Sequence, residues 1–430
     1  MSKKKSATDH CFFCKKHESE VGPLIMSPAS RSLIKTISIR ACSQCLELCK
    51  SLAARSNKKA NSPNLEINQQ KSKVAEEIIE KKRLSPKEIV SHLDQVVVGQ
   101  DKAKRQLAIA VSNHYKRLFC KTTNNEFNDT VVQKSNILMI GGTGTGKTLL
   151  AKTIAEIIDV PFAIADATAL TQAGYCGEDV ESIISALLKN CGGDVCKSQH
   201  GIIFIDEIDK IAMKGRSLNI SRDVSGEGVQ QSLLKILEGS IVNVPPNGGR
   251  KHPNEKFIEI DTTNILFICG GAFSGLDNII KEKHDSLLSR TIGFNLKIED
   301  KKTPIKSVTH DDLIAFGMIP EFMGRLPVIA QTNPLEIGDL AKILKEPRSA
   351  ILKQYQKLLA YDQVELDFSD PAIFFIAELV YKFGTGARGL RSAMETILND
   401  TLFNVDEYKG KKVLIDVDYV KQALGLVIAQ

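Results

Sequence analysis

Short, almost wholly apolar runs recur through the middle of the chain, and segments with helical spacing separate them. Strands buried on both faces read as continuous apolar runs because neither face meets water, whereas half-exposed strands alternate. The pattern therefore predicts an α/β fold, with a parallel five-stranded sheet covered by helices on both faces. The predicted strands are residues 136–140, 161–166, 202–206, 264–269 and 326–330.

Helical patterns flank this region on both sides. Ser85-Pro86-Lys87-Glu88 predicts a helix start, because it combines a capping serine, a proline at the first helical position and a glutamate three residues after the cap. Apolar residues at helical spacing predict a second helix from about residue 101 to 118. From about residue 338 the pattern is mainly helical, with short strand-like pieces at 364–368 and 412–416, which indicates a separate, small C-terminal domain.

Changes in composition predict the domain boundaries. Residues 51–84 are dominated by Asn, Ser, Lys and Gln, which is typical of a linker. The predicted units are a cysteine-bearing domain at 1–50, the linker at 51–84, a large α/β domain at 85–335 and the small C-terminal domain at 336–430.

Length and composition narrow the class of protein. A chain of 430 residues is too long for one core, and 43% hydrophobic with 25% charged residues excludes a collagen-like or largely disordered chain. No apolar run is long enough to cross a bilayer, and no apolar stretch follows the basic N-terminus, so we expect a cytoplasmic protein without a membrane partner. The net charge of +6 is modest and forms no basic stripe, which argues against a nucleic-acid partner.

The strand predicted at 136–140 runs directly into a loop with the pattern G-x-x-x-x-G-K-T, and a helical segment follows. Backbone N–H groups of such a loop hold phosphate oxygens, together with the amino end of the helix. The lysine reaches the terminal phosphates and the threonine hydroxyl binds Mg²⁺, so we expect a site for ATP and Mg²⁺. Its residues are Gly141, Gly142, Thr143, Gly144, Thr145, Gly146, Lys147, Thr148 and Leu149.

The strand predicted at 202–206 delivers two adjacent carboxylates, Asp206 and Glu207, at its carboxyl end. Ligands bind at that end of the strands in open α/β sheets. Beside a phosphate loop, we expect Asp206 to hold the metal through water and Glu207 to polarise the attacking water. The alternative interpretation is that the two acids only begin a surface loop.

Seven further segments are specific enough to identify a family. They are VVVGQ at 96–100, GYCG at 174–177, RDVSGEG at 222–228, GRKHP at 249–253, IGF at 292–294, PEFMGRLP at 320–327 and GARGLR at 386–391. With the phosphate loop they resemble the AAA+ unfoldases, and within them the ClpX family. The resemblance covers most of residues 85–400 and, more loosely, the first 50.

This resemblance implies a ring-shaped homohexamer that binds ATP between subunits and unfolds and translocates proteins. Val98 matches the segment that packs on the adenine. Arg325 matches the arginine finger, which a neighbouring subunit supplies to the phosphates and which can be worth about 10³–10⁵ in rate in P-loop enzymes. Arg388 matches the second sensor, which touches the nucleotide of its own subunit.

The resemblance also implies a central pore that grips substrate proteins. Tyr175 matches the aromatic residue of the pore loop; an aromatic ring between glycines can press on any polypeptide, because dispersion needs no particular sequence. Further substrate contacts implied are Arg222 and Asp223 in a second pore loop, and Arg250, Lys251 and His252 in a basic loop at the pore entrance that favours a carboxyl-bearing tail.

Ile292, Gly293 and Phe294 match the loop tip by which the family docks onto the ClpP peptidase. The residues agree with this, since an apolar tip inside a polar stretch is a poor core element and a typical binding site. We therefore expect an ATP-hydrolysing unfoldase that recognises substrates, directly or through adaptors, and feeds them to ClpP, with no protease activity of its own.

Half of the ten cysteines lie in the first 49 residues. The pairs Cys11-x-x-Cys14 and Cys42-x-x-Cys45 make a four-thiolate set suited to a structural Zn²⁺ without an open coordination position. ClpX-type proteins carry such a module at this place. The alternative is a degenerate module whose cysteines bind no metal.

Three departures from the family pattern stand out: Gly142 replaces the usual proline of the phosphate loop, Cys176 replaces the usual valine of the pore segment, and the two cysteine pairs lie farther apart. They suggest a divergent member.

Three alternative functions remain. A stand-alone remodelling chaperone would share the ATPase and pore residues, so only the segment 292–294 discriminates it. A nucleic-acid motor would need a different channel, and the complete set of hydrolytic residues argues against a regulatory module with a decayed ATPase.

Overall fold

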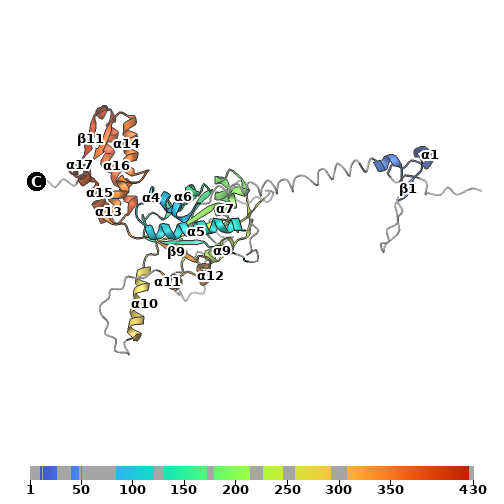
Figure 1. The fold of residues 1–430 in the computed structure, drawn as a ribbon, viewed down its shortest axis with the longest axis horizontal. Coiled ribbons are helices and arrows are strands. Elements are labelled where there is room, and N and C mark those ends of the chain that lie inside the picture. Colours follow the sequence, from blue (N-terminus) through green and yellow to red (C-terminus); the bar gives the residue numbers. More distant parts are fainter. Residues whose placement is uncertain are drawn as a thin grey trace, which may run out of the picture. The chain divides into compact units, whose positions relative to one another are not determined.

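The computed structural model describes residues 10–11, 13–26, 40–47, 50, 84–120, 130, 132–171, 179–213, 226–245, 257–291 and 308–425. The chain divides into two compact units, Met1–Glu77 and Ile78–Gln430, each of which is described by itself (Figure 1). Among the described residues, no helix combines the length and the apolar character that crossing a membrane requires.

The first unit is small and built around cysteines. Helix α1 (Glu18–Val21) precedes strand β1 (Ile25–Met26), which pairs antiparallel with β2 (Arg40–Ala41). Cys11 and Cys42 are buried although the unit contains few other described apolar side chains, so the sulfur atoms themselves form its centre.

The second unit contains a parallel five-stranded sheet, which confirms the predicted α/β class. The strand order is β4-β5-β8-β3-β9, and every neighbouring pair is parallel. The strands are β3 (Ile137–Ile140), β4 (Phe162–Asp166), β5 (Ile202–Asp206), β8 (Leu266–Gly271) and β9 (Val328–Gln331).

Two strand boundaries differ from the prediction for a local reason. Residues 264–265 belong to a turn in which Ile265 N donates to Thr262 O, so β8 begins at Leu266. Likewise Leu326 N donates to Met323 O in the turn that ends helix α12 (Pro320–Gly324), and β9 begins at Val328. Apolar side chains at both places are buried in turns, which hydrophobicity alone does not distinguish from strands.

The two faces of the sheet are covered by separate sets of helices. Alternate strand residues pack into two cores: Ile137 and Met139 lie in one, and Leu138 and Ile140 in the other. The first core is closed by α4 (Pro86–Asp94), α5 (Asp101–Cys120) and α6 (Lys147–Ile158). The second is closed mainly by α7 (Glu181–Asn190), α9 (Glu227–Glu238), α11 (His310–Phe316) and α12.

The predicted capping box begins α4. Ser85 N donates to Glu88 Oε2 at 2.6 Å, and Glu88 N donates to Ser85 Oγ at 3.3 Å. This satisfies two backbone donors that the first turn of a helix otherwise leaves open.

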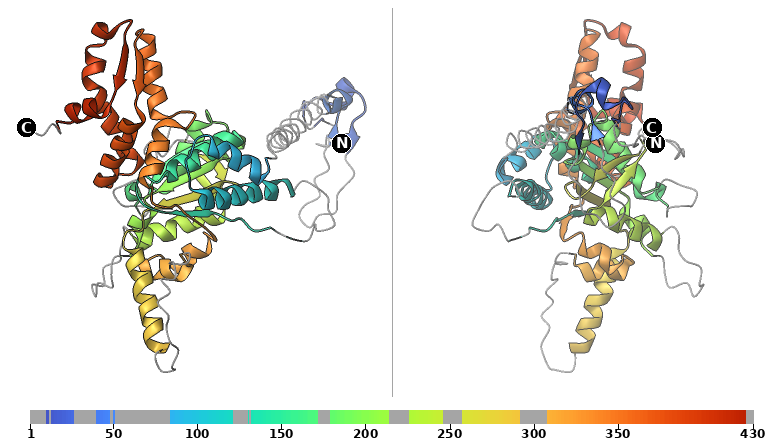
Figure 2. Two further views of the ribbon diagram at one scale, coloured as in Figure 1. Left: turned by 60° about the vertical axis from the view of Figure 1, so that its left-hand side comes forward. Right: turned by 90° about the vertical axis from the view of Figure 1, so that its right-hand side faces the viewer.

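Smaller elements lie in the connections between the strands of the sheet. They are η1 (Ala167–Ala169), α8 (Val195–Ser198), η2 (Ile208–Ile211), and an antiparallel hairpin, not predicted, of β6 (Ile241–Val244) and β7 (Ile258–Asp261). Helix α10 (Leu276–Thr291) extends away from the sheet in both views of Figure 2.

The C-terminal part is mainly helical, as predicted, and has its own core. Buried apolar residues such as Leu344, Ile376 and Leu390 form a cluster distinct from those of the sheet. The elements are α13 (Ile337–Lys345), α14 (Ile351–Tyr361), β10 (Glu365–Phe368), α15 (Asp370–Phe383), α16 (Ala387–Phe403), η3 (Val405–Tyr408), β11 (Lys412–Ile415) and α17 (Val417–Ala423). Strands β10 and β11 pair in parallel.

Candidate functional site

The glycine-rich loop connects β3 to α6 at the carboxyl edge of the sheet. Gly144 and Gly146 have φ angles of 73° and 96°, in the left-handed region that favours glycine. A Cβ on Gly144 would lie only 2.8 Å from Thr385 O of the C-terminal domain. Gly146 caps α6 without a side-chain hydrogen bond, so the first N–H groups of the helix are free to face an anion.

Lys147 is the first residue of α6 and is largely buried. Its Nζ donates to Gly141 O at 2.6 Å and to Gly142 O at 2.9 Å, which holds the ammonium group over the loop. Burial lowers the pKa of Lys147, and the carboxylates of Asp206 and Asp209 oppose that shift. A buried cation held on carbonyl oxygens is well placed to gain from a more negative partner such as a phosphate.

The carboxyl end of β5 brings acidic groups to the same loop. Thr148 Oγ1 donates to Asp206 Oδ2 at 3.1 Å, and Asp206 Oδ1 accepts from Glu207 N at 2.9 Å. Hydroxyl and carboxylate oxygens are the ligands that Mg²⁺ prefers, so this pair fits the ion. Glu207 is exposed and has a φ of 56°, a conformation that is costly for residues other than glycine and that recurs at functional sites.

A cavity of about 600 Å³ joins these groups to the C-terminal domain. Arg388, near the start of α16, lines it together with Lys147, and Ala387 N donates to Gly144 O at 3.2 Å across the two domains. The full lining is Thr143, Gly144, Gly146, Lys147, Thr148, Leu149, Asp206, Glu207, Asp209, Lys210, Ala272, Ser274, Ile351, Ala387, Arg388 and Arg391.

Sequence analysis missed several of these residues. Asp209 Oδ1 accepts from Ala272 N at 3.0 Å, which links the acidic strand end to the end of β8. Asp209 stands in the same acidic segment as Asp206 and was available as a signal. Arg391 ends the segment GARGLR, but the sequence did not assign it to this site. Ser274 and Ile351 carry no local signal, because only the folded chain brings the end of β8 and the start of α14 to the loop.

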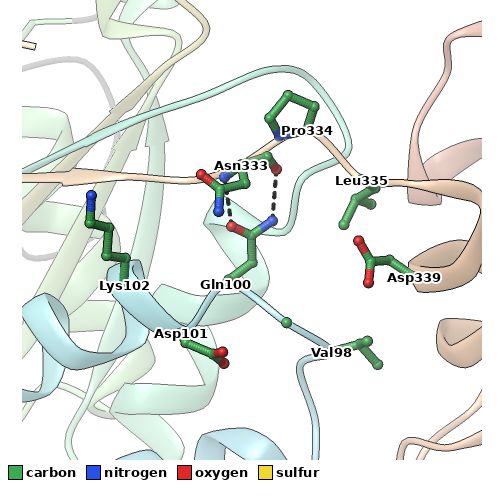
Figure 3. Close-up of a pocket in the computed structure, with 9 residues that line it drawn as sticks. Val98, Gln100, Asp101, Lys102, Asn333, Pro334, Leu335 and Asp339 are labelled. Carbon is green, nitrogen blue, oxygen red and sulfur yellow. Dashed lines mark hydrogen bonds between the residues drawn. The ribbon is translucent and has the colours of Figure 1, made fainter. Parts of the chain in front are cut away.

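Val98 does not line this cavity. It lines a second one of about 390 Å³, formed by the loop before α5 and the segment between β9 and α13 (Figure 3). The side chain of Gln100 joins the two segments that line this cavity. Its Nε2 donates to Asn333 O at 2.8 Å, and its Oε1 accepts from Asn333 N at 2.7 Å.

Arg325 lies at the opposite, amino edge of the sheet. Its backbone oxygen accepts from Asn136 Nδ2 at 3.1 Å, and Asn136 immediately precedes β3, whereas the phosphate loop follows it. The guanidinium forms a half-exposed ion pair with Glu238, 2.7 Å between Nη2 and Oε1. Arg325 is therefore not brought to the phosphate loop of its own chain.

The four cysteines of the first unit form one cluster. The Sγ atoms of Cys11, Cys14, Cys42 and Cys45 all lie within 4.8 Å of one another, and those of Cys14 and Cys42 are 3.9 Å apart. Tetrahedral Zn²⁺ with bonds of about 2.3 Å places its sulfur ligands about 3.8 Å apart, so the cluster fits this metal.

Backbone hydrogen bonds within the cluster favour a thiolate. Those from Cys14 and then Cys42 lower the pKa of Cys11 to about 6, whereas hydrogen bonding among the sulfurs raises the pKa of Cys45 to about 12. Zinc binding by all four sulfurs would therefore release protons. His10 and His17 contact each other edge to face, with ring centroids 4.9 Å apart, and do not join the cluster.

Nine predicted site residues lie outside the described residues: Tyr175, Arg222, Asp223, Arg250, Lys251, His252, Ile292, Gly293 and Phe294. Only the described elements on either side of these segments can be named. Residues 250–252 connect β6 to β7, and residues 292–294 directly follow the last residue of α10.

The parallel sheet, its phosphate loop and the carboxylates at the end of β5 define the class as P-loop ATPases of the AAA type. Family models agree: residues 132–329 match the AAA domain (Cdc48 subfamily), and residues 335–405 match the C-terminal, D2-small domain, of ClpB protein.

Comparison with whole proteins makes the assignment more specific. The chain is 45% identical over 415 residues to the ATP-dependent Clp protease ATP-binding subunit ClpX of Bacteroides thetaiotaomicron, covering 96% of this chain and 95% of that one. It is 44% identical over 428 residues to ClpX of Bacteroides fragilis, covering 99% and 97%, and 45% identical over 414 residues to ClpX of Treponema denticola, covering 94% and 92%. The chain belongs to the ClpX family.

Proposed function

We propose that this protein is an ATP-dependent unfoldase and translocase that recognises protein substrates and feeds them to the ClpP peptidase. One observation carries the proposal: the nucleotide cavity is bounded by both domains of one chain, while Arg325 stands at the opposite edge of the sheet with its side chain half exposed. A site that a neighbour completes is expected of a ring, and a homohexameric ring provides the pore that translocation needs.

Within one subunit we assign hydrolysis to four residues. Lys147 exchanges its carbonyl partners for phosphate oxygens, and the loop from Gly141 to Leu149 holds the phosphates through its backbone. Thr148 and Asp206 hold the site for Mg²⁺, which when bound neutralises charge on the phosphate oxygens. Glu207 orients and polarises the attacking water; its exposure to the cavity and constrained backbone support this role.

Two arginines and Val98 complete the proposed nucleotide site. Arg388 lines the cavity beside Lys147 from its own C-terminal domain, which supports its role as a sensor of the terminal phosphate. Arg325 is supplied by the neighbouring subunit. Val98 lines the second cavity, and we assign to it the contact with the base.

Mechanical work is assigned to the segments outside the described residues. We propose that Tyr175 grips the substrate, that Arg222 and Asp223 form a second contact, and that the basic segment 250–252 attracts carboxylate-bearing tails.

Tyr175→Ala is expected to preserve ATP hydrolysis and abolish unfolding of a folded reporter. Unfolding at the normal rate would exclude Tyr175 from the grip.

Docking to ClpP is assigned to Ile292, Gly293 and Phe294. Helix α10 extends from the body of the domain and ends at Thr291, directly before this segment in the sequence (Figure 1). That position supports an interaction with a second protein. The cysteine unit is proposed to bind structural Zn²⁺ and to receive substrates and adaptors.

A folded fluorescent reporter with a disordered C-terminal tail tests the proposal. The full-length protein is incubated with ATP and reporter, with and without purified ClpP, and both fluorescence and peptide fragments are followed. We expect fluorescence loss with ATP, and fragments only when ClpP is present.

A matched pair of variants tests the docking segment. Phe294→Ala is expected to abolish fragments while reporter unfolding continues, whereas Ile298→Ala, an apolar truncation four positions later, preserves both. Fluorescence loss without ClpP-dependent fragments from the unmodified protein would contradict the peptidase coupling and favour a stand-alone remodelling chaperone.

A further inference from the structure

The segment that leaves β9 for the C-terminal domain is held by side chains from two different parts of the large domain. Thr332 is buried, its N donates to Ile140 O at 2.8 Å, and its Oγ1 lies 2.8 Å from Thr145 Oγ1 in the phosphate loop. The next residue, Asn333, forms both backbone hydrogen bonds with the side-chain amide of Gln100 (Figure 3). Two consecutive residues are thus tied to the phosphate loop and to the loop before α5.

Gln100 is held in an unusual conformation. It is 6% exposed and has a φ of 63°, which for a residue other than glycine persists only when its surroundings enforce it. Its backbone oxygen accepts from Lys104 N at 2.9 Å at the start of α5. The buried Lys104 in turn donates to Asp94 Oδ1 at 2.7 Å and to Val97 O at 2.6 Å, so this loop is braced against the large domain.

The C-terminal domain contacts the same two loops at further points. Arg348 N donates to Gln95 O at 3.0 Å, and Ala387 N donates to Gly144 O at 3.2 Å. Helix α13 begins at Ile337, shortly after Asn333. The orientation of the C-terminal domain is therefore set where residues 332–333 meet the phosphate loop and the loop before α5.

We propose that Thr332 and Gln100 are positioning residues that couple the state of the phosphate loop to the orientation of the C-terminal domain. Thr145 also donates to Gly142 O at 2.9 Å, so a rearrangement of the loop around phosphate is transmitted to Thr332 through one hydroxyl. Gln100 holds Asn333 fixed, so movement is concentrated in the few residues before α13. Hinges generally consist of a few element-terminal residues of this kind.

Two pairs of variants separate the hydrogen bonds from backbone strain and from packing. Asparagine and glycine both tolerate a positive φ, and neither reaches Asn333, so Gln100→Asn and Gln100→Gly remove the clamp without adding strain. Thr332→Val removes the hydroxyl at nearly constant volume. Thr332→Ser restores the hydroxyl and is the matched control.

Hydrogen exchange measured by mass spectrometry on the full-length protein gives a direct readout. In the unmodified protein we expect added ATPγS to slow exchange in peptides covering residues 332–340. In both Gln100 variants exchange there rises by a factor of roughly 5 to 30, the loss of about one to two hydrogen bonds, and becomes insensitive to ATPγS. Thr332→Val loses the ATPγS response and Thr332→Ser regains it.

Retention of the full ATPγS response in Gln100→Asn and Thr332→Val would overturn the proposal. So would faster exchange spread uniformly over all peptides, because the residues would then serve only the stability of the fold.

The reporter assay tests separately whether the coupling matters for unfolding, a consequence that rests on the proposed function. There the ATP consumed per unfolded reporter rises in the same variants. If the unmodified protein hydrolyses ATP but unfolds no reporter, the proposed function fails, while the exchange measurement still decides the coupling.

Discussion

The placement of Arg325 leads to a sharp prediction about cooperation between subunits. Asn136 Nδ2 bonds Arg325 O at the amino edge of the sheet, and Gly141 follows β3 at the carboxyl edge. Five residues of extended chain at about 3.3 Å each separate the edges by about 16 Å, which exceeds the reach of an arginine side chain. We therefore expect Arg325 to act only on the nucleotide of a neighbouring subunit.

The magnitudes of the two effects of Arg325→Ala differ widely. The ion pair with Glu238 is half exposed, with side-chain exposures of 50% and 46%, so its loss costs at most about 1 kcal/mol of folding stability. Loss of an arginine finger lowers turnover by about 10³–10⁵. Glu238→Gln is the matched control, since it weakens the same ion pair but keeps Arg325, and we expect it to retain ATP turnover.

The assay is steady-state ATP hydrolysis by co-expressed variant subunits. Arg325→Ala subunits keep an intact phosphate loop, and Lys147→Ala subunits keep Arg325, so each alone is inactive. In a random equal mixture about one quarter of interfaces combine an intact loop with an intact arginine from the neighbour. Turnover should recover toward about a quarter of that of the unmodified protein if the sites act independently.

Two results would contradict the expectation that Arg325 acts across the interface. Near-normal turnover by Arg325→Ala alone would remove the arginine from catalysis. A mixture no more active than its separate components, in assemblies verified to contain both subunits, would mean that Arg325 does not act across the interface.

The remaining predictions concern single residues of both units. Glu207→Gln should bind ATP normally and lower turnover by at least about a hundredfold, measured by nucleotide titration and phosphate release; unchanged turnover would exclude Glu207 as the residue that activates water. Gly142→Ala should raise the free energy of unfolding by about 0.4–1 kcal/mol, because a Cβ there meets Thr145 Cγ2 at 3.7 Å, an ordinary contact at a negative φ. Gly144→Ala should instead destabilise the domain, since its φ is 73° and the Cβ would approach Thr385 O, and equal melting temperatures would contradict the geometry. Cys14→Ser should lower the zinc content measured by atomic emission and loosen the first unit, and full zinc retention would exclude Cys14 as a ligand.

Features carried by contiguous residues could be predicted from the sequence. The phosphate loop is one continuous segment whose chemistry resides in its own backbone, Lys147 and Thr148, so its pattern is sufficient. The five strands are continuous apolar runs because both faces of the sheet are covered. The four cysteines form two close pairs, and local turns bring the members of each pair together.

Features that join distant segments could not be predicted, because no local spacing determines them. Thr148 and Asp206 are 58 positions apart; the sequence predicted that both serve the same Mg²⁺ site, but their direct hydrogen bond depends on the strand order. Gln100 and Asn333 are 233 positions apart and meet only because β9 is the edge strand that leads into the C-terminal domain.

Features that depend on neighbouring residues differ in this respect from features that depend on how distant segments pack. Residue types at short separation were enough to predict the class of fold, the phosphate-binding chemistry, the two cysteine pairs and the family resemblance. The folded chain was needed to place Arg388 in the cavity wall, Arg325 at the opposite edge of the sheet, and Gln100 against the segment between the domains. Strand order and domain packing arise from many weak contacts across the whole chain, so they specify such positions only after the chain has folded.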